Sequence, residues 1–303
     1  MTRALMITNP VAARTDAKAV GAVLEILRGG GWKVDILATH QPGDARRFAE
    51  EAQVAGFDVL ISYGGDGTAM QVAAAIVGTG IPLGLVPGGT GNLLAGNLRL
   101  PRSAAAAARA ILRGRPRPLD LGAVERADGT HYFAVACGAG FDAELMAGTA
   151  ASAKQRWKMG AYVARALTVL PAVTSVMHAV SVDGQRHEIE AAMVLVANCG
   201  ELMPPFLRLG GAVFPDDGWL DVVAVRAEGL VGSVAAFVDL LRGLESGATR
   251  VWSARGRVIE IAVPAGPPRP VELDGDAAGE TPVTIRLLPH ALHVLAGPAG
   301  GGH

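Results

Sequence analysis

Short apolar runs alternate with helical periodicity over the first third of the chain. Residues 18–28 carry apolar side chains at helical spacing and end in three glycines, a pattern typical of a capped helix. The run 59–63 is uncharged, as expected of a strand covered on both faces. The same reasoning predicts strands at 4–8, 33–39, 59–63 and 83–86, and helices at 18–28, 43–56 and 69–77. This alternation favours a parallel, doubly wound α/β sheet.

A different pattern follows the alanine-rich helix predicted from Pro101 to Leu112. Residues 113–118 mix proline with arginine, and we interpret them as a linker. Strand-like runs then predominate, at 119–126, 131–137, 178–182, 188–197, 219–225, 258–263 and 284–288, with helical patterns only at 154–170 and 229–244. We therefore expect an α/β domain over residues 1–118 and a mostly antiparallel β-sandwich over 119–289, with 290–303 returning to the first domain.

Composition narrows the classes of function. The chain has 303 residues, 50% of them hydrophobic and 18% charged, which suffices for two buried cores. Its net charge of −1 gives no sign of a nucleic-acid partner. Cys137 and Cys199 lack CxxC spacing, which favours buried, reduced thiols in a cytosolic protein. The uncharged stretch 67–98 is long enough to span a bilayer, but prolines and glycines divide it, so we expect no transmembrane helix.

Glycine-rich turns follow two neighbouring predicted strands. The sequence GGDGT at 64–68 comes directly after a strand and enters a helix, where backbone N–H groups and the helix N-terminus favour an anion. PGGTGN at 87–92 follows the next strand, with Thr90 offering a hydroxyl and Asn92 an N-cap. Asp66 would oppose a phosphate unless Mg²⁺ or a hydroxyl lies between them. The spacing matches neither the P-loop nor the dinucleotide fingerprint, so we predict a phosphate site of another kind, with plain turns as the alternative.

These motifs resemble those of the diacylglycerol kinase catalytic-domain family, which includes bacterial lipid kinases, sphingosine kinases and ceramide kinases. The resemblance covers nearly the whole chain. Its motifs are Asn9-Pro10, Thr39 with Gly43-Asp44-Ala45, GGDGT at 64–68, PGGTGN at 87–92, Leu119-Asp120-Leu121-Gly122, the segment 138–144, Asp217-Gly218-Trp219-Leu220-Asp221 and Asp274-Gly275-Asp276. GGDGT is shared with NAD kinases and phosphofructokinase-like folds, so it is specific only to that superfamily. The later motifs, in this order, are what single out the diacylglycerol kinase family. The resemblance implies an α/β domain of that shared type followed by a β-sandwich.

The resemblance also implies ligand sites. ATP would be bound by residues of several loops: Asn9, Pro10, Arg14, Thr39, Gly64, Gly65, Gly67, Thr68, Gly89, Thr90 and Asn92. The family often has a glycine and a hydroxyl after Asn-Pro, whereas Val11-Ala12-Ala13-Arg14 stands here, with Arg14 as a candidate phosphate contact. A structural Mg²⁺ would be held by the carboxylate of Asp217 and carbonyl oxygens of Phe214 and Trp219, the ligands a hard cation prefers. An Asx-capped turn remains the alternative.

Three carboxylates form the catalytic set that the resemblance implies. Asp274 corresponds to the first acid of an Asp-Gly-Glu motif and would be the general base that accepts the proton of the acceptor hydroxyl. Asp276 stands where the family has Glu and would orient that base or bind metal, and Asp66 completes the set. Without the resemblance, Asp274-Gly275 is typical of a hairpin turn. Glu144 is implied to contact the acceptor headgroup, with a surface acid as the alternative.

The resulting hypothesis is an ATP-dependent kinase that phosphorylates a hydroxyl of diacylglycerol or a related lipid alcohol. We expect a cytoplasmic protein in transient peripheral contact with the inner face of the membrane, with an apolar edge that could support a homodimer. The helix at 154–170 and the arginines between 102 and 117 are candidate membrane contacts, with a packed helix and a solvated face as the alternatives. Two other functions stay open, a kinase of a soluble acceptor such as NAD and an inactive nucleotide sensor.

Overall fold

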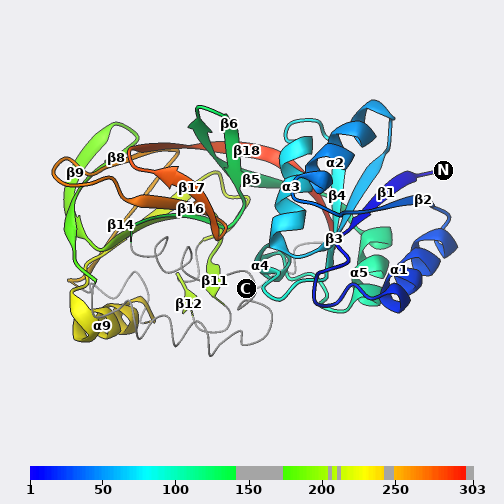
Figure 1. Ribbon diagram of the computed structural model, residues 1–303, viewed down its shortest axis with the longest axis horizontal. Coiled ribbons are helices and arrows are strands. Elements are labelled where there is room, and N and C mark those ends of the chain that lie inside the picture. Colours follow the sequence, from blue (N-terminus) through cyan, green and yellow to red (C-terminus); the bar gives the residue numbers. More distant parts are fainter. Residues whose placement is uncertain (141–172, 204–206, 210–212, 242–248, 298–303) are drawn as a thin grey trace. The chain divides into compact units, whose positions relative to one another are not determined.

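The computed structural model describes residues 1–140, 173–203, 207–209, 213–241 and 249–297 (Figure 1). The chain forms two compact units, one of Met1–Asp120 with Pro289–His303 and the other of Leu121–Leu288. The sequence pattern predicts this boundary at Pro118. Two long strands, β5 (Arg115–Arg126) and β18 (Val283–Ala296), run from one unit into the other.

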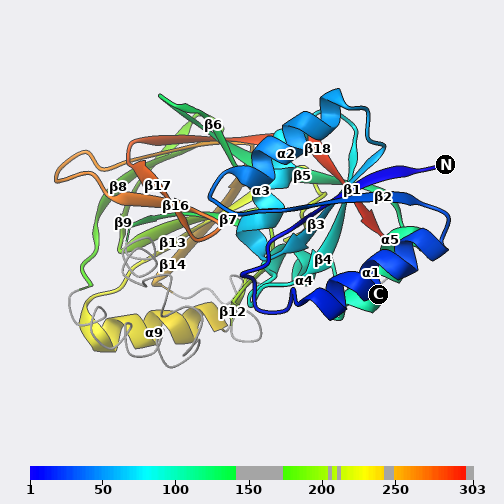
Figure 2. The same cartoon turned by 45° about the vertical axis from the view of Figure 1, so that its right-hand side comes forward.

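The N-terminal unit contains a parallel sheet in the order β2-β1-β3-β4, with the end of β18 pairing beside β4. The strands are β1 (Arg3–Thr8), β2 (Lys33–Ala38), β3 (Val59–Gly64) and β4 (Pro82–Pro87). The helices are α1 (Ala17–Gly29), α2 (Asp44–Val54), α3 (Asp66–Ile76), α4 (Leu93–Asn97) and α5 (Ala104–Arg113). Figure 2 shows α1 and α5 on one face of the sheet and α2 and α3 on the other. The doubly wound α/β prediction is confirmed, and β3 is buried along its whole length, as its uncharged sequence indicated.

Two local predictions in this unit were wrong. Helix α3 begins at Asp66 rather than Ala69, so the GGDGT sequence supplies the first turn of the helix itself. The segment 113–118 is not a linker, because β5 already begins at Arg115. Pro116 and Pro118 are two residues apart in this strand, so both missing N–H donors lie along the same side of it.

The C-terminal unit is the predicted antiparallel sandwich. One sheet has the order β14-β13-β10-β7-β16-β17, and β8, β9 and β15 pair antiparallel in another, with the first part of β18 beside β15. The strands are β6 (Gly129–Phe133), β7 (Ala136–Gly140), β8 (Val176–Val182), β9 (Gln185–Ala191), β10 (Met193–Ala197), β11 (Glu201–Met203), β12 (Leu207–Arg208), β13 (Leu220–Val225), β14 (Val251–Gly256), β15 (Val258–Ala262), β16 (Pro270–Leu273) and β17 (Asp276–Glu280), with helix α9 at Gly229–Leu241. A single apolar cluster is formed by side chains from most of these strands.

Strand boundaries in this unit differ from the sequence analysis. The predicted strand 131–137 is two strands, β6 and β7, which are separated by Ala134 and Val135. The predicted strand 188–197 is likewise divided into β9 and β10, and β14, β16 and β17 were not predicted. The helix proposed at 154–170 lies outside the described residues.

Candidate functional site

The loops at the carboxyl end of the parallel sheet hold the predicted nucleotide-binding residues. In the order β2-β1-β3-β4, the strands that follow β1 in sequence lie on opposite sides of it, so the strand order reverses between β1 and β3. In open α/β sheets, ligands bind outside the carboxyl ends of the strands at such a switch point. Asn9 follows β1 and Gly65 follows β3, so these two loops flank the point where a ligand is expected.

Asn9 connects the two loops. Its backbone N–H donates to the carbonyl of Tyr63 at 3.0 Å, and its side-chain Nδ2 donates to Thr68 Oγ1 at 3.2 Å. Its Oδ1 accepts the N–H of Val11 at 3.1 Å, which turns the chain immediately after β1. Asn9 therefore fixes the first loop against the first turn of α3, while Pro10 beside it is exposed.

Thr15 is a residue of this loop that the sequence analysis missed. Its buried hydroxyl donates to the carbonyl of Asn9 at 2.6 Å, with the carbonyl of Ala12 at 3.0 Å. The hydroxyl of Tyr63 donates to the carbonyl of Arg14 at 2.8 Å, and the side chain of Arg14 is exposed. The loop thus has a defined shape without the glycine and hydroxyl that the family often has after Asn-Pro. A hydroxyl directly before Asp16, which caps α1, was the available signal.

The two glycine-rich loops touch each other through their backbones. A Cβ atom added to Gly89 would lie 2.5 Å from the Cα of Gly65, a separation that real Cβ atoms essentially never show. The carbonyl of Gly64 accepts the N–H groups of Gly88 at 2.7 Å and Gly89 at 3.1 Å. Only glycine at position 89 permits this approach, and it lets the backbones of the two loops pack directly against each other.

Asn92 holds the second loop in shape. It stands at the N-cap position of α4 with φ at +50°, yet its side chain does not cap the helix. Instead its Oδ1 accepts the N–H of Gly89 at 2.9 Å, and its Nδ2 donates to the carbonyl of the same residue at 2.9 Å. The predicted capping role was wrong, because both the Oδ1 and the Nδ2 of Asn92 are hydrogen-bonded to the backbone of Gly89. Thr90, between them, is exposed.

Asp66 lies between the loops. Its Oδ1 accepts the N–H of Leu94 at 3.3 Å, and a Cβ on Gly91 would lie 3.0 Å from its Oδ2. Burial raises the pKa of Asp66, and hydrogen bonds from the N–H groups at the start of α4 oppose this shift. Asp66 lines a cavity of about 10 Å³, which has room for about one water. The hydroxyl of Ser62 is buried without a partner and lines the same cavity.

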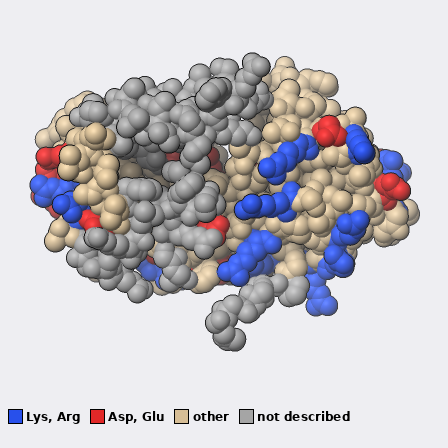
Figure 3. All heavy atoms as spheres, turned by 90° about the horizontal axis from the view of Figure 1, so that it is seen from below, with Lys and Arg blue, Asp and Glu red and all other residues tan. Residues whose placement is uncertain are grey.

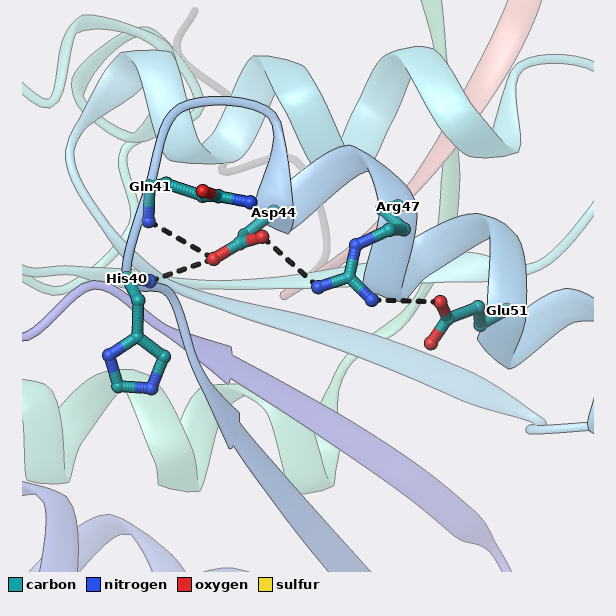
Figure 4. A network of polar contacts seen from close by, with 5 residues as sticks. All are labelled: His40, Gln41, Asp44, Arg47 and Glu51. Atoms are coloured by element: carbon teal, nitrogen blue, oxygen red, sulfur yellow. Dashed lines mark hydrogen bonds and ion pairs between the residues drawn. The ribbon is translucent and has the colours of Figure 1, made fainter.

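The loop after β2 is held by a polar network (Figure 4). The buried carboxylate of Asp44 accepts the N–H groups of His40 at 2.9 Å and Gln41 at 3.1 Å, and it pairs with Arg47 at 3.0 Å. The hydrogen bond from His40, followed by that from Arg47, lowers the pKa of Asp44 to about 2. This network positions the loop that follows Thr39, which explains the Asp of the Gly-Asp-Ala motif as a structural residue.

Asp274 lies in the C-terminal unit, in the tight turn between β16 and β17, with φ at +49°. Its carboxylate accepts three backbone N–H groups, those of Ala134 at 2.8 Å, Val135 at 2.9 Å and Ala136 at 2.9 Å. These donors come from the connection that divides β6 from β7. These charge-assisted hydrogen bonds fix the orientation of the carboxylate.

The residues around Asp274 differ in exposure. Asp276, the first residue of β17, is exposed. Glu272 is only 5% exposed, and its carboxylate accepts the N–H of Gly275, so it closes the same turn. The sequence analysis missed Glu272, because nothing in a strand pattern marks an acid that folds back on the following turn. The other acceptor-side candidate, Glu144, lies outside the described residues.

The predicted metal ligands surround the turn before β13. Asp217 Oδ1 accepts the N–H of Trp219 at 3.0 Å, which is an Asx-capped turn, and Asp217 Oδ2 contacts the guanidinium of Arg255. Phe214 and Trp219 are 51% and 37% exposed. Among the residues that the structure describes, no three His, Cys, Asp or Glu side chains are grouped so as to hold a metal ion.

Asp120 and Gly122, two positions of the Leu-Asp-Leu-Gly motif, have structural roles. Asp120 is fully buried and accepts the N–H of His290 at 2.8 Å, which joins β5 to β18 within the N-terminal unit. A Cβ on Gly122 would lie 2.0 Å from the ring of Phe133, so glycine is required there. The motif therefore shapes the strand that continues from one unit into the other.

Comparisons with known proteins agree with these features. Residues 3–124 match the family model of the diacylglycerol kinase catalytic domain, and residues 135–296 match that of the YegS C-terminal NAD kinase beta sandwich-like domain. These two matches indicate a two-domain kinase, with an α/β catalytic domain and a β-sandwich. The chain belongs to the family of diacylglycerol kinases and YegS-like lipid kinases, as its motifs indicated.

Individual relatives extend over most of the chain. A Pseudomonas aeruginosa protein named as a YegS-like lipid kinase is 32% identical over 289 residues, covering 93% of this chain and 90% of its own length. A Bacillus subtilis protein named diacylglycerol kinase is 27% identical over 299 residues, covering 97% of this chain and 96% of its own length. A solved Bacillus anthracis structure, named as a diacylglycerol kinase, has a TM-score of 0.81 at 26% identity and covers 98% and 96%. With a Synechocystis protein of unassigned function the match is 28% over 251 residues and spans 57% of that longer protein.

Proposed function

We propose that the protein transfers the γ-phosphoryl group of ATP to a hydroxyl group of diacylglycerol or a related lipid alcohol. The observation that carries the nucleotide half of this proposal is the contact of two glycine-rich loops beside the switch point of the parallel sheet. The lipid half rests on the family to which the chain belongs and on the names of its relatives.

The phosphates of ATP would bind at the first turn of α3. The first N–H groups of a helix have no partner within the helix, and they carry a partial positive charge. The exposed Gly67 leaves this turn open, and Thr90 offers a hydroxyl from the second loop. Phosphoryl transfer depends mainly on positioning and on stabilising charge, so a preformed cradle of N–H groups fits the reaction.

Asp66 is the residue that would hold the Mg²⁺ that accompanies ATP. It is the only charged residue from Gly64 to Leu98, and its half-buried carboxyl group lies beside Gly91 of the second loop. A single carboxylate beside the proposed phosphate site fits a divalent ion that keeps most of its water. When bound, the ion would neutralise charge on the phosphates.

Asp274 is proposed as the general base. As the acceptor oxygen forms its bond to the γ-phosphorus, the bond from that phosphorus to the leaving ADP oxygen breaks, and the hydroxyl proton passes to the Asp274 carboxylate. The three N–H donors on this carboxylate hold it in one orientation. Asp276 would orient this base or bind metal. Glu144 would contact the acceptor headgroup.

Peripheral contact with an anionic membrane, at the cytoplasmic face, would bring the protein to its substrate. Residues 67–119 contain six arginines and no Asp or Glu. Four of these side chains, Arg102, Arg109, Arg113 and Arg115, are exposed and form no ion pair within the described part of the chain. Figure 3 views the molecule from below the orientation of Figure 1, and on that side of the N-terminal unit Lys and Arg predominate over Asp and Glu. No helix in the described part of the chain is long and apolar enough to cross a membrane.

The test is incubation with γ-labelled ATP and mixed micelles that contain one lipid alcohol at a time. Transfer of label to diacylglycerol, a sphingoid base or a ceramide would support the proposal and name the acceptor. Label on NAD in the absence of micelles would identify a kinase of a soluble acceptor instead. ATP binding without any labelled product would contradict the proposal and favour a nucleotide sensor.

A further inference from the structure

The turn that precedes β13 is held by two arginines. It comprises Asp216 to Trp219, and the resemblance to lipid kinases implies a structural Mg²⁺ there. The arginines, Arg255 and Arg257, lie at the end of β14 and just beyond it. Their contacts with the turn are specific, and they bear on whether a metal is needed.

Arg255 contacts two carboxylates at once. Its Nε lies 3.1 Å from Asp221 Oδ1, and its Nη2 contacts Asp217 Oδ2. The remaining oxygen of Asp217 accepts the N–H of Trp219. A planar guanidinium presents its donors in a fixed fork that suits such a double contact. Both oxygens of Asp217 are therefore occupied by donors from the chain itself.

Strand pairing fixes the place of Arg255. β13 and β14 are antiparallel, and Asp221 lies directly opposite Arg255 in their register. Opposed residues of antiparallel strands have their Cβ atoms about 4.5–5.5 Å apart, so an Arg–Asp contact follows from the register itself. Arg255 reaches Asp217 from this anchored position.

Arg257 holds the same turn by different contacts and provides a matched control. Its Nε donates to the carbonyl of Gly218 at 3.2 Å, and its guanidinium lies 4.8 Å from the centre of the Trp219 ring. It thus binds a carbonyl and an aromatic face rather than the two carboxylates that Arg255 joins.

These contacts do not fit a divalent cation at Asp217. Mg²⁺ requires oxygen ligands at roughly 2.0–2.1 Å in near-octahedral geometry. The oxygens of Asp217 already accept an N–H and a guanidinium, and a second cation would be repelled by Arg255. We infer that Arg255 supplies the positive charge that this turn needs, in place of a metal ion, so that folding of the C-terminal unit is independent of divalent cations.

The experiment is thermal unfolding without nucleotide, in EDTA and in millimolar MgCl₂. The wild-type melting temperature should be the same in both. Arg255→Ala leaves two neighbouring carboxylates without their cation, and it should lower the melting temperature in EDTA by roughly 5 °C or more. MgCl₂, or the added change Asp217→Asn, should recover much of this loss. Arg257→Ala should show no response to MgCl₂, and Arg255→Lys, which keeps a cation, should show none either.

A fall of the wild-type melting temperature in EDTA that MgCl₂ reverses would overturn the inference, and this measurement needs no variant. Arg255→Ala melting like the wild type in EDTA would also overturn it, because the turn would then need no counter-charge from that residue.

Discussion

The contact between the two glycine-rich loops gives the most quantitative prediction. In Gly89→Ala, the new Cβ atom would lie 2.5 Å from the Cα of Gly65. Carbon atoms separate to about 3.5 Å or more, so the two loops must move apart by roughly 1 Å. The two atoms of Gly65 in this contact, its Cα and its N at 3.3 Å, are backbone atoms, so no side-chain rotation can relieve the clash between the loops.

A shift of this size should be costly for catalysis. A misplacement of about 1 Å can lower a rate by roughly 100-fold, which corresponds to about 2.7 kcal/mol of transition-state stabilisation. We therefore expect kcat/KM of Gly89→Ala to fall by about two orders of magnitude, with weaker binding of a non-hydrolysable ATP analogue. Initial rates with labelled ATP and calorimetric titration would measure the two effects.

Gly96→Ala is the matched control. Gly96 lies in α4, a few residues beyond the same loop, and a Cβ added there meets nothing within 4 Å. Alanine in a helix is favoured over glycine by roughly 0.5–1 kcal/mol, so this variant should be at least as stable as the wild type and fully active. Activity of Gly89→Ala within threefold of Gly96→Ala would refute the view that close approach of the loops forms the site.

Three further predictions concern charged or titratable side chains. Asp66→Ala should lower turnover at least 100-fold, and near-normal initial rates would exclude Asp66 from the site. Burial lowers the pKa of His178 below 6.5, so the folded state binds fewer protons and stability should fall as pH drops through 6.5. Between pH 7.5 and pH 5.5, the free energy of unfolding measured in urea should fall more for the wild type than for His178→Gln. Equal falls for the two proteins would contradict this prediction. The double variant Arg109→Glu/Arg113→Glu should sediment less with phosphatidylglycerol vesicles than the wild type, whereas Arg46→Glu on α2 should not. Equal binding of the wild type and both variants would refute the membrane-facing role of these arginines.

Local patterns predicted the N-terminal unit well. Apolar runs, glycine caps and the GGDGT motif are signals carried by residues next to each other in the sequence. The strands β1 to β4 could therefore be placed to within about a residue. The segment 113–118 was misread because paired prolines normally end an element, whereas here they lie within β5. The start of α3 was misplaced because Gly67 discouraged a helix that the tertiary contacts nevertheless form.

Most of the missed residues contact partners that are far away in the sequence, and the others belong to no recognisable sequence motif. Arg255 matters because strand pairing sets it against Asp221, and no sequence period reveals that register. The three donors on Asp274 come from residues about 140 positions earlier. The break between β6 and β7 was missed for the same reason, since its buried N–H groups find their acceptor in the distant Asp274.

The central claim is that Asp274 acts on the acceptor and not on the nucleotide. The most direct measurement compares Asp274→Asn with the wild type for binding of an ATP analogue and for transfer of label to lipid. The amide keeps the size of the side chain and should bind the analogue within threefold of the wild type, while transfer falls by at least 1,000-fold, because the group that accepts the proton is gone. Retained transfer, or a loss of nucleotide affinity as large as the loss of transfer, would contradict the account.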